Sequence, residues 1–210
     1  MVLDVGCPRC PAPVAESDTG WTCAAHGQVP PLWRVTEASY DSFGELLQRA
    51  AGFPTYLPWP MASGWQLTDF GVVVGAPGPV ATVTSVSGMS PVDGPVEVTL
   101  ISEEPGTGLG SRCAGTVHSD PGAEIGEQAP SFKVRVDGQL APLWLLSSTV
   151  DDTSTDRGVA AGEARGRWLW LVVTPASALL LLREEWAIAD VSGVGASLLE
   201  MPYGGPRAAW

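Results

Sequence analysis

Residues 67–103, "LTDFGVVVGAPGPVATVTSVSGMSPVDGPVEVTLISE", decide the fold of this chain. β-Branched residues dominate three runs within this stretch, at 67–75, 80–88 and 96–103, and Gly or Pro bounds each run. Short runs of this kind, separated by turns, are typical of consecutive antiparallel strands. In the second run both faces mix apolar with polar residues, so the alternation does not indicate which face is buried.

The second half of the chain continues this pattern. Residues 131–138 alternate apolar with charged side chains, which predicts a strand with one buried face. The polar, turn-rich stretch 150–166 predicts a surface loop, and so does the glycine-rich stretch 104–130. Further strands are expected at 141–149, 167–174, 186–193 and 197–203, the last two at a sheet edge.

The apolar run that follows Pro175 has two interpretations. In the first, residues 178–184 form a strand that pairs with 167–174 as a hairpin across 175–177. In the second, a buried helix covers 176–187, because apolar runs by themselves do not separate strand from helix. Both interpretations remain open at this point.

One helix is expected between the N-terminal segment and the first long strand. Ser42 and Glu45 have the spacing of a capping box, which predicts a helix over about residues 42–51. Gly52 provides a C-terminal cap, and Pro54 prevents the helix from continuing. The apolar side chains of one helical face are Phe43, Leu46, Leu47 and Ala50.

The composition agrees with a mainly β protein. The chain has 210 residues, of which 45% are hydrophobic, so it can bury a sizeable core. Its 25 Gly and 19 Pro favour short strands and turns over long helices. We expect a small zinc ribbon at 1–35, a helical connector at 36–52, and an antiparallel β-sandwich or barrel-like domain at 53–210.

Four potential metal ligands lie near the N-terminus, with the spacing C-x2-C-x12-C-x2-H: Cys7, Cys10, Cys23 and His26. Two ligands separated by two residues, such as Cys7 and Cys10, can reach one ion. The twelve residues between Cys10 and Cys23 suffice for a hairpin that turns at 17–20. Three thiolates and one imidazole suit tetrahedral Zn2+, and a closed shell of four protein ligands indicates a structural site. The alternatives are that the four residues are unrelated, or that the first two form a redox-active Cys pair. Pro11 and Pro13 disfavour the redox pair because such a pair normally opens a helix.

The stretch 103–115, "EEPGTGLGSRCAG", is the second candidate site, and we call it the glycine loop. Its glycines bring backbone amides close together and its arginine adds a positive charge, which suits an anionic ligand. It matches neither a phosphate-binding loop with Gly-Lys-Ser/Thr nor the dinucleotide fingerprint, and its two acids repel phosphate. A structural loop is the competing interpretation. The candidate ligand-binding residues are Glu103, Glu104, Gly106, Gly108, Gly110 and Arg112.

Three further groups carry weaker signals, and each has a structural alternative. A thiol and an imidazole could form a catalytic pair, three acids could bind a cation, and three indoles could form a ligand platform. These groups are Cys113 with His118; Asp151, Asp152 and Asp156; and Trp144, Trp168 and Trp170.

Charge and hydropathy limit the partners and the location. A net charge of −12 makes nucleic-acid binding unlikely in general. No signal peptide is visible, and the most apolar run, 168–182, is too short for a membrane span. We therefore expect a cytosolic protein, in which disulfides are a poor use of the cysteines. A hairpin at 168–182 that lies on a membrane surface is a third hypothesis.

Four motifs carry a resemblance to a known family: "CPRC…WTCAAHG…PLWR", "LPWPMASGW", "EEPGTGLGSRCAG" and "GRWLWLVVTP". With them the chain resembles an uncharacterised actinobacterial family of cytosolic proteins, a domain of unknown function. The resemblance implies one architectural unit over 1–210 and implies no reaction. The N-terminal spacing is also similar to that of zinc ribbons, although Pro11 stands where these often have Gly.

These observations favour a non-enzymatic protein with structural zinc that binds a protein partner or a small ligand. No catalytic motif is assembled in the sequence. The alternative is an enzyme that acts on a small phosphorylated or acyl metabolite, with its site near the glycine loop.

Overall fold

The computed structural model describes residues 3–122, 124–146, 156–183, 187–195 and 200–210. The strands of its large sheet are β1 (Leu3–Gly6), β5 (Leu32–Val35), β6 (Tyr56–Pro58), β7 (Gln66–Gly75), β8 (Gly78–Ser90), β9 (Gly94–Glu103), β10 (Phe132–Val136), β11 (Gln139–Leu146), β12 (Gly158–Ala164), β13 (Arg167–Thr174) and β14 (Ala187–Asp190). Within the described residues they form one sheet of 11 strands, in the order β1-β5-β7-β8-β9-β13-β12-β11-β10-β14-β6.

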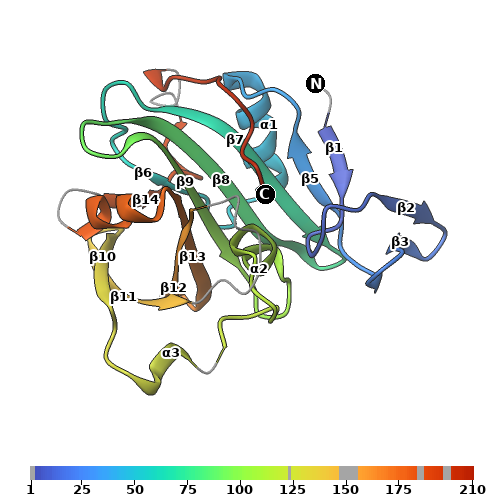
Figure 1. Ribbon diagram of the computed structural model, residues 1–210. Coiled ribbons are helices and arrows are strands. Elements are labelled where there is room, and N and C mark those ends of the chain that lie inside the picture. The colour runs from blue at the N-terminus through green and yellow to red at the C-terminus, as the bar shows by residue number, and fades with distance from the viewer. Residues whose placement is uncertain (1–2, 123, 147–155, 184–186, 196–199) are drawn as a thin grey trace.

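This sheet confirms the prediction of a mainly β, antiparallel fold. Its strand pairs are antiparallel except for β10 with β14, which run parallel. Figure 1 shows that the long strands β7, β8 and β9 curve, and that β13, β12, β11 and β10 continue the curl. The architecture is therefore a single curled sheet, closer to the expected barrel than to a sandwich of two sheets.

Both faces of β7, β8 and β9 are buried, which explains the weak alternation in 67–103. Val86, Val98 and Leu100 lie in an inner core on the concave side of the sheet. Val83 and Ile101 lie in a separate outer core on the opposite side. Because apolar residues are needed on both faces, the sequence of these strands shows no clean period of two.

The helix α1 spans Tyr40–Ala50, so it begins two residues before the predicted start at about Ser42. The N-cap is Ser39, whose hydroxyl accepts a hydrogen bond from the amide of Ser42, while the Ser42 hydroxyl accepts one from the amide of Ser39. The capping box therefore joins two serines and does not use Glu45. At the other end, Ala51 adopts the left-handed conformation, one residue before the predicted Gly52.

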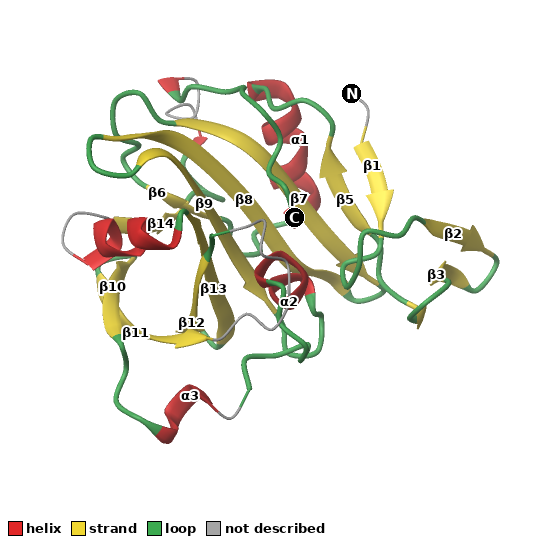
Figure 2. Ribbon diagram, viewed as in Figure 1, coloured by secondary structure: helices red, strands yellow, loops and turns green. Residues whose placement is uncertain are grey.

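α1 covers one end of the inner core (Figure 2). Phe43, Leu46 and Ala50 on its buried face contribute to that core, as the sequence predicted. The Phe43 ring meets Phe70 of β7 edge-on, with 4.9 Å between ring centroids. This contact anchors the helix to the sheet.

The predicted surface loop at 150–166 is wrong in part, because β12 occupies Gly158–Ala164 in the middle of the sheet. Residues 147–155 lie outside the described part. The strand was missed because it consists of small residues, which pack against close neighbours. A Cβ atom at Gly162 would lie 2.2 Å from the carbonyl oxygen of Pro142, and one at Gly158 would lie 2.2 Å from Leu179.

After β13 the chain forms the 3-10 helix η1 (Ala176–Arg183), so a strand at 178–184 is wrong and the helical alternative is the better one. β14 confirms the strand expected at 186–193, but it lies between β10 and β6 and is not an edge. Within 197–203, residues 197–199 lie outside the described part, and Tyr203 forms an isolated bridge with Leu67. The 104–130 stretch contains the helices α2 (Leu109–Ala114) and α3 (Glu124–Glu127).

A second, small sheet consists of β2 (Val14–Ser17), β3 (Gly20–Cys23) and β4 (Gly27–Gln28). Its first two strands form the hairpin that the sequence predicted, which projects from one side of the molecule in Figure 1. The strands that flank it, β1 and β5, belong to the large sheet. The division of the chain at residues 35 and 52 stays a prediction.

Candidate functional site

The four predicted metal ligands lie together at the junction of the two sheets. Cys7 and Cys10 follow β1, and the amide of Cys7 donates to the carbonyl oxygen of Ala12, 3.2 Å away. Cys23 ends β3, and His26 lies in the turn before β4. The β2–β3 hairpin therefore returns the chain to the first pair, as the spacing predicted.

Three of the six distances between these side chains match the edges of a tetrahedron around one ion. The ligand atoms all lie within 4.8 Å of one another. The Sγ atoms of Cys10 and Cys23 are 3.7 Å apart, and Nδ1 of His26 lies 3.5 Å from Cys7 Sγ and 3.6 Å from Cys23 Sγ. Zn–S bonds of about 2.3 Å and a Zn–N bond of about 2.0 Å require S···S edges of about 3.8 Å and S···N edges of about 3.5 Å. These four residues could therefore form a metal site.

Backbone amides stabilise the thiolates that a metal needs. The amide of Arg9 donates to Cys7 Sγ at 3.4 Å. At the second pair, the amide of Ala25 is the largest influence that lowers the pKa of Cys23 to about 6. Burial acts in the opposite direction on Cys7 and raises the pKa of its thiol to about 11. All four cysteines of the chain are free thiols, so no disulfide competes for these ligands.

The glycine loop folds around a buried carboxylate. Glu103 ends β9 with its side chain fully buried, and its Oε2 accepts from the amides of Leu109 and Gly110 at 2.8 and 3.2 Å. These are the first amides of α2, so the carboxylate stabilises the start of this helix. Burial raises the pKa of Glu103 to about 7, although the two amides act against this shift. Glu104 lies near the surface and forms an ion pair with Arg167 at 2.9 Å.

Two of the three glycine amides that were expected to hold an anion are therefore occupied by the protein itself. The amide of Gly106 donates to Asp120 Oδ1 at 2.8 Å, and that of Gly110 donates to Glu103. The glycines are required for shape. Gly106 and Gly108 have positive φ angles of 82° and 83°, and a Cβ atom at Gly110 would lie 2.2 Å from the Trp170 indole nitrogen.

Two arginines join the glycine loop to the metal centre. Arg9, between the first two ligands, donates from Nη2 to the carbonyl oxygen of Gly106 at 2.6 Å and from Nε to that of Thr107 at 3.1 Å. In the reverse direction, Nη1 of Arg112 donates to the carbonyl oxygen of Cys7 at 2.5 Å. The two candidate sites of the sequence are thus neighbours, and each holds the backbone of the other.

The comparisons with known proteins gave a single finding. A model for a family of unknown function, DUF6758, matches residues 1–209. The chain belongs to this family. No curated protein and no solved structure matched the sequence. Membership in DUF6758 therefore groups this chain with its relatives along the whole of its length and assigns no reaction to it.

The weaker candidates of the sequence fall into the core or onto the surface of this DUF6758 protein. Cys113 is buried in the outer core, and burial raises the pKa of its thiol, while His118 is exposed. Trp170 is fully buried in the same core, which favours packing over a ligand platform. Asp156 is exposed, and Asp151 and Asp152 lie outside the described residues.

The apolar run 168–182 is also accounted for by the fold. Leu169, Leu171 and Val173 of β13 point into the inner core. Among the residues that the structure describes, no helix combines the length and the apolar character needed to cross a membrane.

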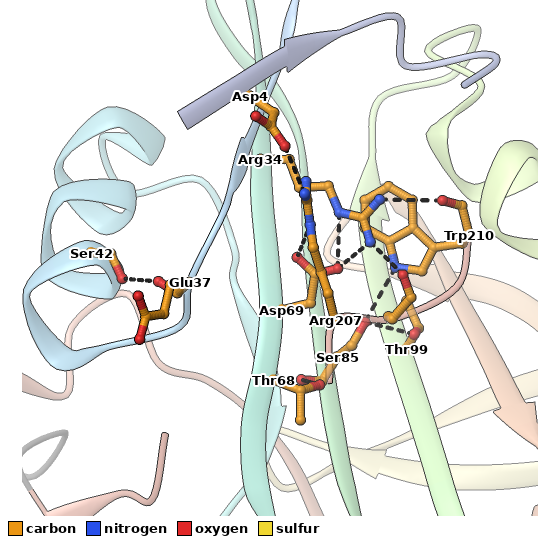
Figure 3. A network of polar contacts seen from close by, with 11 residues as sticks. Asp4, Arg34, Glu37, Ser42, Thr68, Asp69, Ser85, Thr99, Arg207 and Trp210 are labelled. Carbon is orange, nitrogen blue, oxygen red and sulfur yellow. Dashed lines mark hydrogen bonds and ion pairs between the residues drawn. The ribbon is translucent and has the colours of Figure 1, made fainter. Parts of the chain in front are cut away.

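Sequence reasoning missed a polar network on the outer face of the large sheet (Figure 3). Asp69 of β7 is fully buried and forms an ion pair with Arg34 of β5, with 2.9 Å between Arg34 Nε and Asp69 Oδ2. Arg207 lies beside this pair and bonds to Asp4 at 2.6 Å, and the Trp210 ring stacks on the Arg34 guanidinium at 3.5 Å. Two features of the sequence could have indicated this network: the acid Asp69 within an apolar strand, and Arg34 in the motif "PLWR".

A groove of about 770 Å³ separates the small sheet from α1 and the β7–β8 turn. Trp21 and Trp33 meet edge-on in it, with 5.8 Å between their ring centroids, and Arg49 lies 4.7 Å above Trp33. Pro30 and Pro31 complete its apolar surface, and the described residues that line it include no Asp or Glu. The groove is thus aromatic and uncharged except for one arginine.

Proposed function

We propose that this member of DUF6758 is a non-enzymatic binding module whose N-terminal segment is folded by one structural zinc ion. The observation that carries this proposal is the match between the S···S and S···N distances of 3.5–3.7 Å and the edges of a zinc tetrahedron. Three thiolates and an imidazole favour zinc over calcium or magnesium, which prefer oxygen ligands.

The ligand set supports a structural role for the ion. Cys7, Cys10, Cys23 and His26 fill all four positions of a tetrahedral ion and leave none for water or a substrate. The segment they hold has little core of its own, since its buried hydrophobic residues are Cys7, Cys23 and Val29. Metal binding supplies about 10 kcal/mol or more of folding free energy in such segments.

Binding is favoured over catalysis by what surrounds the metal centre. The amides of Gly106 and Gly110 already have carboxylate partners, so the glycine loop supports the fold where an enzyme would need free donors. The groove at Trp21 and Trp33 offers an aromatic surface to a protein partner or small ligand. We place the protein in the cytosol, where a reducing environment keeps zinc-binding thiols free.

Metal analysis of protein purified under reducing conditions tests this proposal. We expect one zinc per chain, retained by Cys113→Ala and lost by Cys10→Ser, because the control removes a thiol that lies outside the metal centre. Less than about half an equivalent of zinc or iron in the wild-type protein would contradict a structural metal site. Turnover of an acyl or phosphoryl substrate by the zinc-loaded protein, abolished by a point substitution, would contradict the non-enzymatic role.

A further inference from the structure

A cavity of about 430 Å³ lies between β1, the 11–13 segment, β5 and the C-terminal segment. Its size is within the range of sites for small molecules. We call it the arginine cavity, because three of the residues that line it are arginines. Its lining residues include Asp4, Pro11, Arg34, Arg112, Arg207 and Trp210.

The charge of this lining is opposite to that of the chain as a whole. The protein has 23 acidic and 11 basic residues, yet Arg34, Arg112 and Arg207 all face one cavity. Asp4 is the one acidic side chain among the described residues that line it, and the buried Asp69 pairs with Arg34 from behind. This concentration of guanidinium groups makes the cavity a local positive site on an acidic protein.

The three arginines differ in how far their donors are already used. Arg34 is largely committed to the fold, because it donates to Asp69 and to the carbonyl oxygens of Ala208 and Trp210. Arg112 donates from Nη1 to Cys7, but its buried Nε has no hydrogen-bond partner, and it pairs with no carboxylate among the described residues. A guanidinium group has five N–H donors, so Arg112 retains several for a ligand.

Arg207 is held by a partner that a ligand can replace. Its Nη1 bonds to Asp4 at 2.6 Å, and the Asp4 side chain is 54% exposed. Its Nε lies 3.9 Å from Oδ1 of the buried Asp69, which is too far for a good hydrogen bond. Figure 3 shows Arg34 and Arg207 gathered around Asp69, with Asp4 at the outer side of Arg207.

We propose that the arginine cavity binds a small oxyanion, a phosphate or carboxylate group of a small molecule, through Arg112 and Arg207. Guanidinium groups bind such anions through pairs of parallel hydrogen bonds, and Arg112 lines the cavity without an ion-pair partner among the described residues. This inference deepens the proposed function and rests on it, because the carbonyl of Cys7 in the metal centre positions Arg112.

Calorimetric titration of the zinc-loaded, full-length protein at constant ionic strength tests this proposal, with inorganic phosphate and succinate as probes. We expect saturable binding of at least one probe, weakened about tenfold in Arg207→Gln through the loss of charge-assisted hydrogen bonds. Asp4→Asn removes the competing carboxylate and tightens binding about threefold. Arg135→Gln is the matched control, because this exposed arginine on β10 does not line the cavity. We expect this variant to bind the probes with the wild-type affinity.

Each outcome of this titration either supports or overturns anion binding in the arginine cavity. A preference for phosphate or for succinate identifies which oxyanion the natural ligand carries. Binding of neither probe, or equal binding by wild type and Arg207→Gln, overturns the proposal. Arg112→Lys gives a second measure, because it keeps the charge but loses the paired geometry and weakens binding. Zinc content, measured on the same samples, separates the two proposals: zinc-loaded protein that binds no anion contradicts this inference alone, whereas absence of zinc contradicts the proposed function.

Discussion

The segment with the four potential metal ligands and the large sheet differ in how much hydrophobic core they have. Around the small sheet the buried hydrophobic residues are Cys7, Cys23 and Val29, two of which are themselves proposed ligands. The large sheet instead has an inner core and an outer core that bury both of its faces. With the proposed zinc ion, the first region depends on one group of four ligands, while the second distributes its stability over many contacts.

The glycine loop connects these two regions. Its backbone carbonyls accept from Arg9, its Arg112 donates to Cys7, and its helix α2 contributes Cys113 to the outer core. We therefore expect a change at the four potential metal ligands to alter the glycine loop first. The inner core, on the other side of the sheet, should change less.

The largest expected effect is the loss of one metal ligand. Cys23→Ser removes a thiolate, so the N-terminal segment loses metal-derived folding energy of about 10 kcal/mol while the large sheet remains folded. Hydrogen exchange checks this: amides of 14–28 lose protection and amides of 81–86 keep it.

Cys113→Ala is the control for this substitution, because it changes a buried thiol of the outer core and no proposed ligand. We expect it to cost about 1–2 kcal/mol and to leave the protection of 14–28 unchanged. Equal protection of 14–28 in Cys23→Ser and wild type would show that the small sheet does not need the metal.

A smaller effect is expected where the glycine loop packs on the sheet. In Gly110→Ala the new Cβ atom would lie 2.2 Å from Trp170 Nε1, and overpacking of this kind costs about 3 kcal/mol. In Gly106→Ala nothing lies within 4 Å of the new atom, so only the positive φ of 82° costs energy, about 1–2 kcal/mol. Urea unfolding compares the two variants, and a larger loss in Gly106→Ala would contradict the packing argument.

A further effect concerns pH. Burial raises the pKa of Glu103 from 4.5 to about 7, so the folded protein holds a proton that the unfolded chain releases. The resulting stabilisation is fully present below pH 4.5 and is lost as the pH rises to about 7. Glu103→Gln is therefore expected to reduce the difference in unfolding free energy between about pH 5.5 and about pH 8.

Glu104→Gln, one residue further on, is the matched control for this pH measurement. Its side chain is 41% exposed and pairs with Arg167 at the surface, so we expect it to keep the pH dependence of the wild-type protein. If both variants behaved alike, the pH dependence would arise from groups other than the buried carboxylate.

The predictions that succeeded depend on neighbours close in the chain. The ligand spacing of Cys7, Cys10, Cys23 and His26 brings the four side chains together because a tight turn and a short hairpin suffice. The strands within 67–103 form because β-branched residues and turns alternate there. The helix at 40–50 was found for the same reason, although its cap lies at Ser39.

The predictions that failed depend on contacts distant in the chain. β12 contains small residues that are poor strand formers, and they form a strand because they pair with β11 and β13 on either side. Leu179 and Pro142 leave no room for a larger residue at Gly158 and Gly162. The arginine cavity combines residues from both ends of the sequence, with Asp4 bonded to Arg207 across 203 positions. No local pattern marks such a pair.

The sequence by itself determined the mainly β class, the positions of most strands and the grouping of four potential metal ligands. These features follow from side-chain period, turn residues and ligand spacing, which act over a few residues. Only the tertiary structure decided that the glycine loop uses its amides on Glu103 and Asp120 and that three arginines face one cavity. Burial and the pairing of charges decide these features, and both depend on which distant segments the fold brings into contact.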